Sequence, residues 1–367
     1  MPHPVPRSVP LLAVLWFAAC AVPLPSRPPL LAAPDRAFLE DLTVAVVEAS
    51  RVRPGESAGG QGPNSTGCTL LRPGGRDDYP AFWIRDYAMS LDCGVIPLAE
   101  QLPLLRLAAA CQPLGDTARV LASGSRVPRG AIPDHITFRG VPIYFPGTVA
   151  DEAGQGGAVW GAIPPLDDAF WFVHMAHVAV TASGDPALLH ETIEGATLLA
   201  RLRAALAMPP RRPDGLVVHV EHDDRGVNFG FDDSIVHTGD LLFATLLLYR
   251  ATRELAELLA LAGEADEAAR LGANADSMRP VIAATFALPD GMLRASTATS
   301  AEPDVWGTAF AVFVGALEPA AERAAGAALT RAYAAGTIAW RGAIRHVPTD
   351  RDARPDSAWE SALTPKN

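Results

Sequence analysis

Residues 82–89 read Phe-Trp-Ile-Arg-Asp-Tyr-Ala-Met, so that Trp83, Arg85 and Asp86 stand together at the predicted start of a helix. The face of Trp83 suits the C–H side of a pyranose ring, and Arg85 and Asp86 can make charge-assisted hydrogen bonds to hydroxyl groups. The alternative is a buried Arg–Asp ion pair beside a core tryptophan. The stretch therefore predicts a sugar-binding site, and the rest of the chain must decide between these interpretations.

Around this stretch the apolar residues recur at the three-and-four spacing of helices, with few alternating strands. The first half of 234–262 is apolar nearly all round, as in an inner helix, whereas 319–334 carries charges typical of an outer helix. No fixed sequence period is present, which disfavours a solenoid. Helices are predicted over residues 34–52, 84–93, 98–110, 167–182, 186–207, 234–262, 264–286, 304–317 and 319–334.

Trp83-Ile84-Arg85-Asp86 resembles the Trp-x-Arg-Asp signature of six-hairpin glycosidases, the group of glucoamylase, trehalase and glycogen-debranching type enzymes. The resemblance implies an all-α fold, the (α/α)6 toroid of helical hairpins, with long loops on one face. It also implies that Arg85 and Asp86 hold the sugar in the subsite before the cleaved bond. A closed toroid needs more helices than the pattern predicts, so the last hairpin is expected to be absent.

A second segment, Gly230-Phe231-Asp232-Asp233, leads into the predicted inner helix. Asp233 or the following Ser234 suits a helix N-cap, which explains one polar residue but not both carboxylates. In the resembling glycosidases the general acid is an Asp in such a Gly-aromatic-Asp segment, which assigns that role to Asp232. The phenylalanines around Asp232 and the like charge of Asp233 both favour a protonated carboxyl group.

Further subsites are predicted at two other helix starts. Asp167 and Asp168 precede an aromatic cluster, although the helix dipole alone also favours acidic residues there. Trp306 is a predicted stacking platform for a sugar ring.

An inverting mechanism needs a second carboxylate roughly 6.5–9.5 Å from the acid. This catalytic base is expected to be Glu360 or to lie beyond Asn367. The helix starts that bear these residues are expected to converge on one hollow.

Composition limits the partners. The 367-residue chain has a net charge of -11, which argues against nucleic acid or an anionic membrane surface and suits a neutral carbohydrate. Its single lysine, Lys366, excludes sites that need a lysine for phosphate or Schiff-base chemistry. Neither a His-Glu-x-x-His motif nor C-x-x-C spacing occurs, so no metal or cofactor is predicted.

The first residues predict export. Residues 1–22 resemble a signal peptide, 23–33 a Pro-rich tether, and 34–367 the glycosidase-like domain. Two processing routes fit: cleavage at a small-x-small site, or a lipoprotein box that would anchor the chain through a lipid at Cys20. Either route places the mature protein outside the cytoplasm, secreted or periplasmic. Cys68, Cys93 and Cys111 then remain, an odd number that allows one disulfide.

Three functions follow from these patterns. The first is an exported glycoside hydrolase, inverting and exo-acting on an oligosaccharide or glycan, with Asp232 as the proton donor. The second is a sugar epimerase of the same fold that uses His237 or His174 as acid or base. The third is a carbohydrate-binding remnant that keeps the cleft but lacks the base.

Overall fold

The computed structural model describes residues 31–73, 79–146, 155–157, 160–228 and 235–349. It divides into two units, Met1–Leu42 and Thr43–Asn367. The described part of the first unit is the start of helix α1, where Arg36 Nε donates to Glu40 Oε1 at 2.8 Å. All other elements belong to the second unit.

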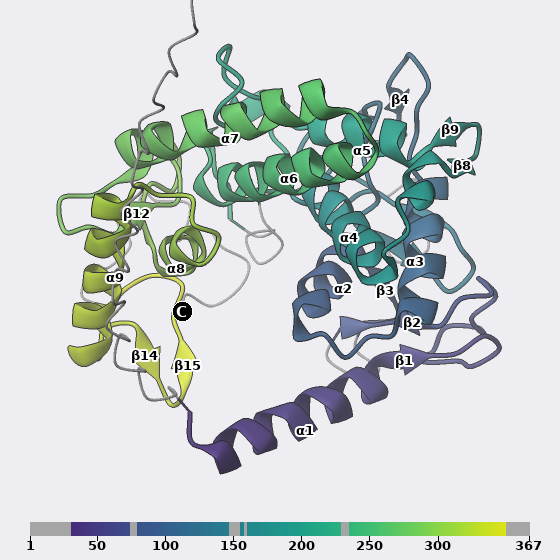
Figure 1. Ribbon diagram of the computed structural model, residues 1–367, viewed down its shortest axis with the longest axis horizontal. Coiled ribbons are helices and arrows are strands. Elements are labelled where there is room, and N and C mark those ends of the chain that lie inside the picture. The colour runs from purple at the N-terminus through teal and green to yellow at the C-terminus, as the bar shows by residue number, and fades with distance from the viewer. Residues whose placement is uncertain (1–30, 74–78, 147–154, 158–159, 229–234, 350–367) are drawn as a thin grey trace, which may run out of the picture. The chain divides into compact units, whose positions relative to one another are not determined.

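Helices dominate the described residues, as the sequence predicts (Figure 1). The α-helices are α1 Ala33–Ser50, α2 Ile84–Ser90, α3 Leu98–Ala110, α4 Asp168–Ser183, α5 Leu198–Ala207, α6 Leu242–Leu261, α7 Ala265–Phe286, α8 Val305–Phe313 and α9 Pro319–Ala334. Three short 3-10 helices are η2 Leu91–Cys93, η4 Pro186–His190 and η5 His222–Asp224.

The strands are two or three residues long and pair locally. They are β1 Arg51–Val52, β2 Leu70–Leu71, β3 Ala81–Trp83, β4 Arg119–Val120, β5 Arg126–Val127, β6 His135–Thr137, β7 Pro142–Ile143, β8 Thr192–Ile193, β9 Ala196–Thr197, β10 His219–Val220, β11 Gly239–Asp240, β12 Leu293–Arg294, β13 Pro303–Asp304, β14 Ala339–Trp340 and β15 Ala343–Ile344. The sheet that matters for the site has the order β3-β6-β7 and is antiparallel.

The even-numbered helices α2, α4, α6 and α8 pack in a row, and α4 and α6 are buried over most of their length. Helix α4 packs against α2, α3, α5 and α6, and α6 also packs against α7 and α8 (Figure 1). Every residue from Leu242 to Tyr249 of α6 is buried, whereas α9 buries only Ala325 and Ala328. The inner character predicted for 234–262 and the outer character predicted for 319–334 are thus found in α6 and α9. Such a row is what consecutive helical hairpins produce.

Two predicted helices are wrong in part. The helix expected over 186–207 is interrupted by the hairpin of β8 and β9, where Glu194 and Gly195 have φ of 46° and 80°. Two adjacent residues with positive φ fit a tight hairpin turn and cannot continue a helix. The helix restarts at α5, where Thr197 Oγ1 accepts from the Ala200 backbone N–H.

The helix expected from residue 234 begins only at Leu242. The preceding β11 contains Gly239, with φ of 82° and so little space that a Cβ would lie 2.7 Å from Thr297 Oγ1. This glycine turn delays the helix. Likewise, the end of the predicted helix over 84–93 is the 3-10 helix η2, and α8 ends at Phe313 rather than at residue 317.

Cys68, Cys93 and Cys111 are all free thiols, so the disulfide that their number allows is not formed. Burial raises the pKa of Cys111 to about 11, which keeps this thiol protonated. Among the described helices, none combines the length and the apolar composition needed to cross a membrane.

Candidate functional site

Arg85 lies at the centre of a buried cluster of carboxylates. Its side chain belongs to α2, and Asp167 binds it in bidentate fashion, with Nε–Oδ2 at 2.5 Å and Nη2–Oδ1 at 3.1 Å. Asp134 Oδ1 lies 3.4 Å from Nη1 and Asp168 Oδ2 lies 3.6 Å from Nη2. Arg85 is 6% exposed and the three aspartates are 0% exposed. One guanidinium thus faces three carboxyl groups away from water.

Local structure explains how residues distant in sequence meet here. The register of β3 on β6 places Trp83 opposite His135, and the Ile84 backbone N–H donates to the Asp134 carbonyl at 3.1 Å. Arg85 in the first turn of α2 therefore starts next to Asp134. Asp167 is the N-cap residue of α4, but its side chain makes no capping hydrogen bond. Its carboxylate binds Arg85 instead, so helix capping does not account for this residue.

The pKa values of Asp168 and Asp134 are shifted in opposite directions. Burial, together with the charges of Asp167 and Asp134, raises the pKa of Asp168 well above its usual range despite the opposing effect of Arg85. Burial also acts to raise the pKa of Asp134, but the hydrogen bond with His135 and the charge of Arg85 outweigh it, and the pKa is lowered. Two carboxyl groups around one guanidinium thus have pKa values shifted in opposite directions, a pattern typical of sites that transfer protons.

Several buried polar atoms in this region have no hydrogen-bond partner among the described residues. They are both carboxyl oxygens of Asp168 and Nε2 of His135. Most buried polar groups in native proteins are paired, and exceptions gather where a site takes water or a ligand. Their position around Arg85 favours a functional site over a purely structural ion pair.

Trp83 has one of its faces covered. Its indole stacks on the imidazole of His135, with ring centroids 4.5 Å apart and an interplanar angle of 25°, and Tyr79 meets it edge-on at 5.3 Å. Nδ1 of His135 lies 2.7 Å from Asp134 Oδ2. The predicted sugar platform is thus fixed by the same histidine that contacts the carboxylate cluster. Trp83 remains partly exposed.

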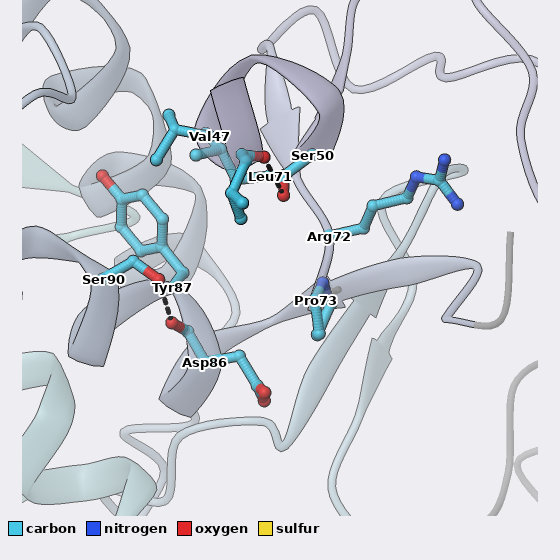
Figure 2. Close-up of a pocket in the computed structure, with 9 residues that line it drawn as sticks. Val47, Ser50, Leu71, Arg72, Pro73, Asp86, Tyr87 and Ser90 are labelled. Atoms are coloured by element: carbon cyan, nitrogen blue, oxygen red, sulfur yellow. Dashed lines mark hydrogen bonds between the residues drawn. The ribbon is translucent and has the colours of Figure 1, made fainter. Parts of the chain in front are cut away.

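Asp86 lines a small cavity of about 150 Å³ beside α2. Figure 2 shows its carboxylate and the hydroxyl of Tyr87 projecting from α2 in different directions, with Ser90 Oγ donating to the Asp86 backbone carbonyl at 2.8 Å. Burial raises the pKa of Asp86 although the charge of Arg85 opposes it. Ligand pockets usually have volumes of roughly 300–1,000 Å³, so this cavity is too small for an oligosaccharide.

A cavity of about 440 Å³ lies among the loops and is within the usual range for a ligand. Ile163 and Met208 supply apolar wall, and Arg126, His219 and Asp224 supply polar groups. An apolar surface with a few polar side chains is the composition that sugar rings require. Ile163 stands on the segment that leads directly into the Asp167 N-cap of α4, so this cavity borders the chain that builds the cluster.

Trp306 contacts different partners from those of Arg85. Its ring stacks on His346 with centroids 4.8 Å apart, and its Nε1 donates to the Ile344 carbonyl at 3.3 Å. The neighbouring Asp304 caps α8 by accepting from the Gly307 backbone N–H at 2.6 Å, and it lies 3.1 Å from His346 Nε2. At this helix start the carboxylate acts as an N-cap.

The structure thus brings together Trp83, Arg85, Asp167 and Asp168 of the predicted set. Asp232, Asp233 and Glu360 lie outside the described residues, as do the signal segment and Cys20. Sequence reasoning missed Asp134 and His135, which complete the cluster. The sequence feature that could have indicated them is the pair Asp134-His135, which stands between apolar residues in Ile132-Pro133-Asp134-His135-Ile136. If such a segment is buried, its acid and imidazole need polar partners.

Comparisons with known proteins add little to this geometry. No protein-family model matches the chain, and no curated protein matches it. Among solved structures, the chain is similar to a GH78 family rhamnosidase of Bacillus sp. GL1, with a TM-score of 0.46 and 13% sequence identity. The match covers 69% of this chain and 24% of that chain, so this chain spans about a quarter of its length.

Proposed function

We propose that the protein is a glycoside hydrolase built on an α/α toroid and exported from the cytoplasm. The observation that carries the proposal is the buried Arg85 cluster, in which one guanidinium contacts Asp134, Asp167 and Asp168, and in which the pKa of Asp168 is raised while that of Asp134 is lowered. The residues of the Trp-x-Arg-Asp motif take part in this arrangement, as expected for a saccharide site. The row of even-numbered helices, with α4 and α6 mostly buried, supports the toroid.

Roles within the proposed site follow from burial. The N–H groups of Arg85 are directed to carboxylates, so we assign Arg85 to positioning Asp134 and Asp167. Trp83 and Asp86 are partly exposed and are assigned to the sugar. Asp232 remains the proposed proton donor and Glu360 the proposed base, which would activate water on the opposite face of the sugar and invert the anomeric carbon.

Purified full-length protein should release the aglycone from at least one member of a panel of aryl glycosides that covers both anomeric configurations. Asp232→Asn should lower kcat by about a hundredfold or more, because general acid catalysis contributes roughly 10²–10⁴. Asp116→Asn is the matched control, since the Asp116 side chain is fully exposed. NMR of the first-formed product should show the inverted anomer.

The outcomes separate the alternatives. Full activity of Asp232→Asn would remove Asp232 from the mechanism. An epimerised sugar without hydrolysis would favour the epimerase, and saccharide binding without any turnover would favour the binding remnant. His174, one of the two histidines considered for the epimerase, already has both ring nitrogens in contact with charged groups, which is unfavourable for a free acid or base at this position.

A further inference from the structure

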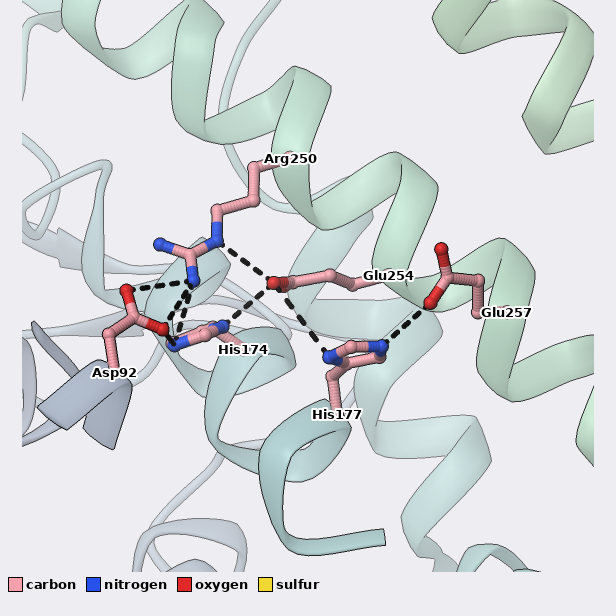
Figure 3. A network of polar contacts seen from close by, with 6 residues as sticks. All are labelled: Asp92, His174, His177, Arg250, Glu254 and Glu257. Carbon is pink, nitrogen blue, oxygen red and sulfur yellow. Dashed lines mark hydrogen bonds and ion pairs between the residues drawn. The ribbon is translucent and has the colours of Figure 1, made fainter. Parts of the chain in front are cut away.

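A second cluster of ionisable residues joins α4 to α6, apart from the Arg85 cluster. His174 and His177 project from α4 toward Glu254 of α6 (Figure 3). Nδ1 of His174 lies 2.7 Å from Glu254 Oε1, and Nδ1 of His177 lies 3.9 Å from the same oxygen. The three ligand atoms that these side chains offer all lie within 4.8 Å of one another.

We propose that His174, His177 and Glu254 bind a divalent transition-metal ion, with Zn²⁺ as the best match. Two imidazoles and one carboxylate are a ligand set that zinc accepts, with a fourth position left for water. Metal–ligand bonds of about 2.0–2.2 Å place neighbouring ligand atoms of a tetrahedron about 3.4 Å apart. The observed separations bracket this value, so small side-chain rotations are sufficient.

The outer contacts of both histidines match a zinc site. Nε2 of His177 lies 2.8 Å from Glu257 Oε2, and Nε2 of His174 lies 3.3 Å from Asp92 Oδ1. Each imidazole thus directs one nitrogen to the proposed ion and the other to a carboxylate. In metalloproteins this arrangement fixes the ring and makes the ligating nitrogen more basic.

Glu254 provides an independent indication of a ligand. The residue is 8% exposed, and its Oε2 has no hydrogen-bond partner among the described residues. Its other oxygen accepts from Arg250 Nε at 2.9 Å. A buried, ionised oxygen without a partner is costly, and a bound cation would compensate it. His177 is 22% exposed at its side chain, which gives an ion access from solvent.

The charges in the network leave room for a divalent cation. Asp92, Glu254 and Glu257 contribute three negative charges, and Arg250 contributes one positive charge, which leaves two negative charges when the histidines are neutral (Figure 3). Arg250 also lies 3.0 Å from His174 Nε2 and donates to Asp92 at 3.0 Å. With the ion on Nδ1, the neutral imidazole of His174 carries its single proton on Nε2, and this N–H and Arg250 both donate to Asp92.

The proposal is independent of the glycosidase assignment and is tested on chelator-treated full-length protein. Titration with Co²⁺ should give visible ligand-field bands that saturate at one equivalent, and Zn²⁺ should displace the Co²⁺ and raise Tm. His177→Gln should weaken binding by about a hundredfold or more, and Glu257→Gln, which alters only the outer contact, by about tenfold. His222→Gln is the matched control, because His222 is exposed and contacts only the neighbouring Asp223 among the ion pairs of the described residues.

Absence of saturable Co²⁺ and Zn²⁺ binding by the wild type would overturn the proposal. So would a His177→Gln variant that binds as tightly as the wild type while circular dichroism shows it folded. If His177→Gln is not folded, the Glu257→Gln variant decides: unchanged affinity overturns the outer contact and the site, and a tenfold loss supports them.

Discussion

The protonation of Asp168 makes a quantitative prediction about stability. The pKa of this carboxyl group is raised in the folded protein, chiefly by burial, while in the unfolded chain an Asp titrates near about 3.9. Above that pH the folded protein holds a proton that the unfolded chain has lost. The free energy of unfolding of the wild type therefore falls by about 1.4 kcal/mol per pH unit from this group, until the pH passes the folded pKa.

Asp168→Asn keeps the shape of the neutral acid but does not titrate. The difference in unfolding free energy, variant minus wild type, should therefore increase by about 1.4 kcal/mol per pH unit above the unfolded pKa, for as long as the pH stays below the folded pKa. Any cost of burying the new amide is constant with pH and does not change this slope. Urea unfolding followed by tryptophan fluorescence at several pH values measures it, with Asp116→Asn as the exposed control. A flat or falling difference would show that Asp168 is ionised and refute the reasoning.

Two further substitutions test the packing. Arg85→Met leaves Asp134 and Asp167 buried without their counter-charge, so it should cost about 3–5 kcal/mol at neutral pH. Because the folded pKa of Asp134 is lowered, its favourable contribution exists above the unfolded pKa, and the loss should shrink on acidification; a constant loss in urea unfolding contradicts this. Gly130→Ala should cost at least about 1–2 kcal/mol, since φ is 85° and a Cβ would lie 2.3 Å from the Ala204 carbonyl oxygen. Gly62→Ala, in open space, should leave Tm unchanged, and equal effects of the two would refute the argument.

Local sequence patterns were enough to locate most helices. Helices α3 and α9 begin and end at the predicted residues, because their apolar spacing, and in α9 the proline at the first helical position, reflect interactions within one helix. The failure over 186–207 has a local cause as well. Gly195 adopts a positive φ in a hairpin, and the surrounding apolar periodicity concealed this turn.

The candidate site could be predicted only in part. The Trp-x-Arg-Asp motif and the Asp167-Asp168 pair identified residues that meet, because aromatic and charged groups at helix starts are visible in sequence. Their partner Asp134 could not be found in this way. Asp134 lies 49 residues after Arg85, and the pairing of β3 with β6 brings them together.

The sequence by itself determined the helical class of the protein and the residue types that can do chemistry, because periodicity and side-chain chemistry are properties of short segments. Only the tertiary structure decided which charges face each other. Asp167 and Arg85 are 82 residues apart, and His174 and Glu254 are 80 apart. Burial then sets which carboxyl group keeps its proton, since the cost of an ion depends on the water and charges around it in the folded protein.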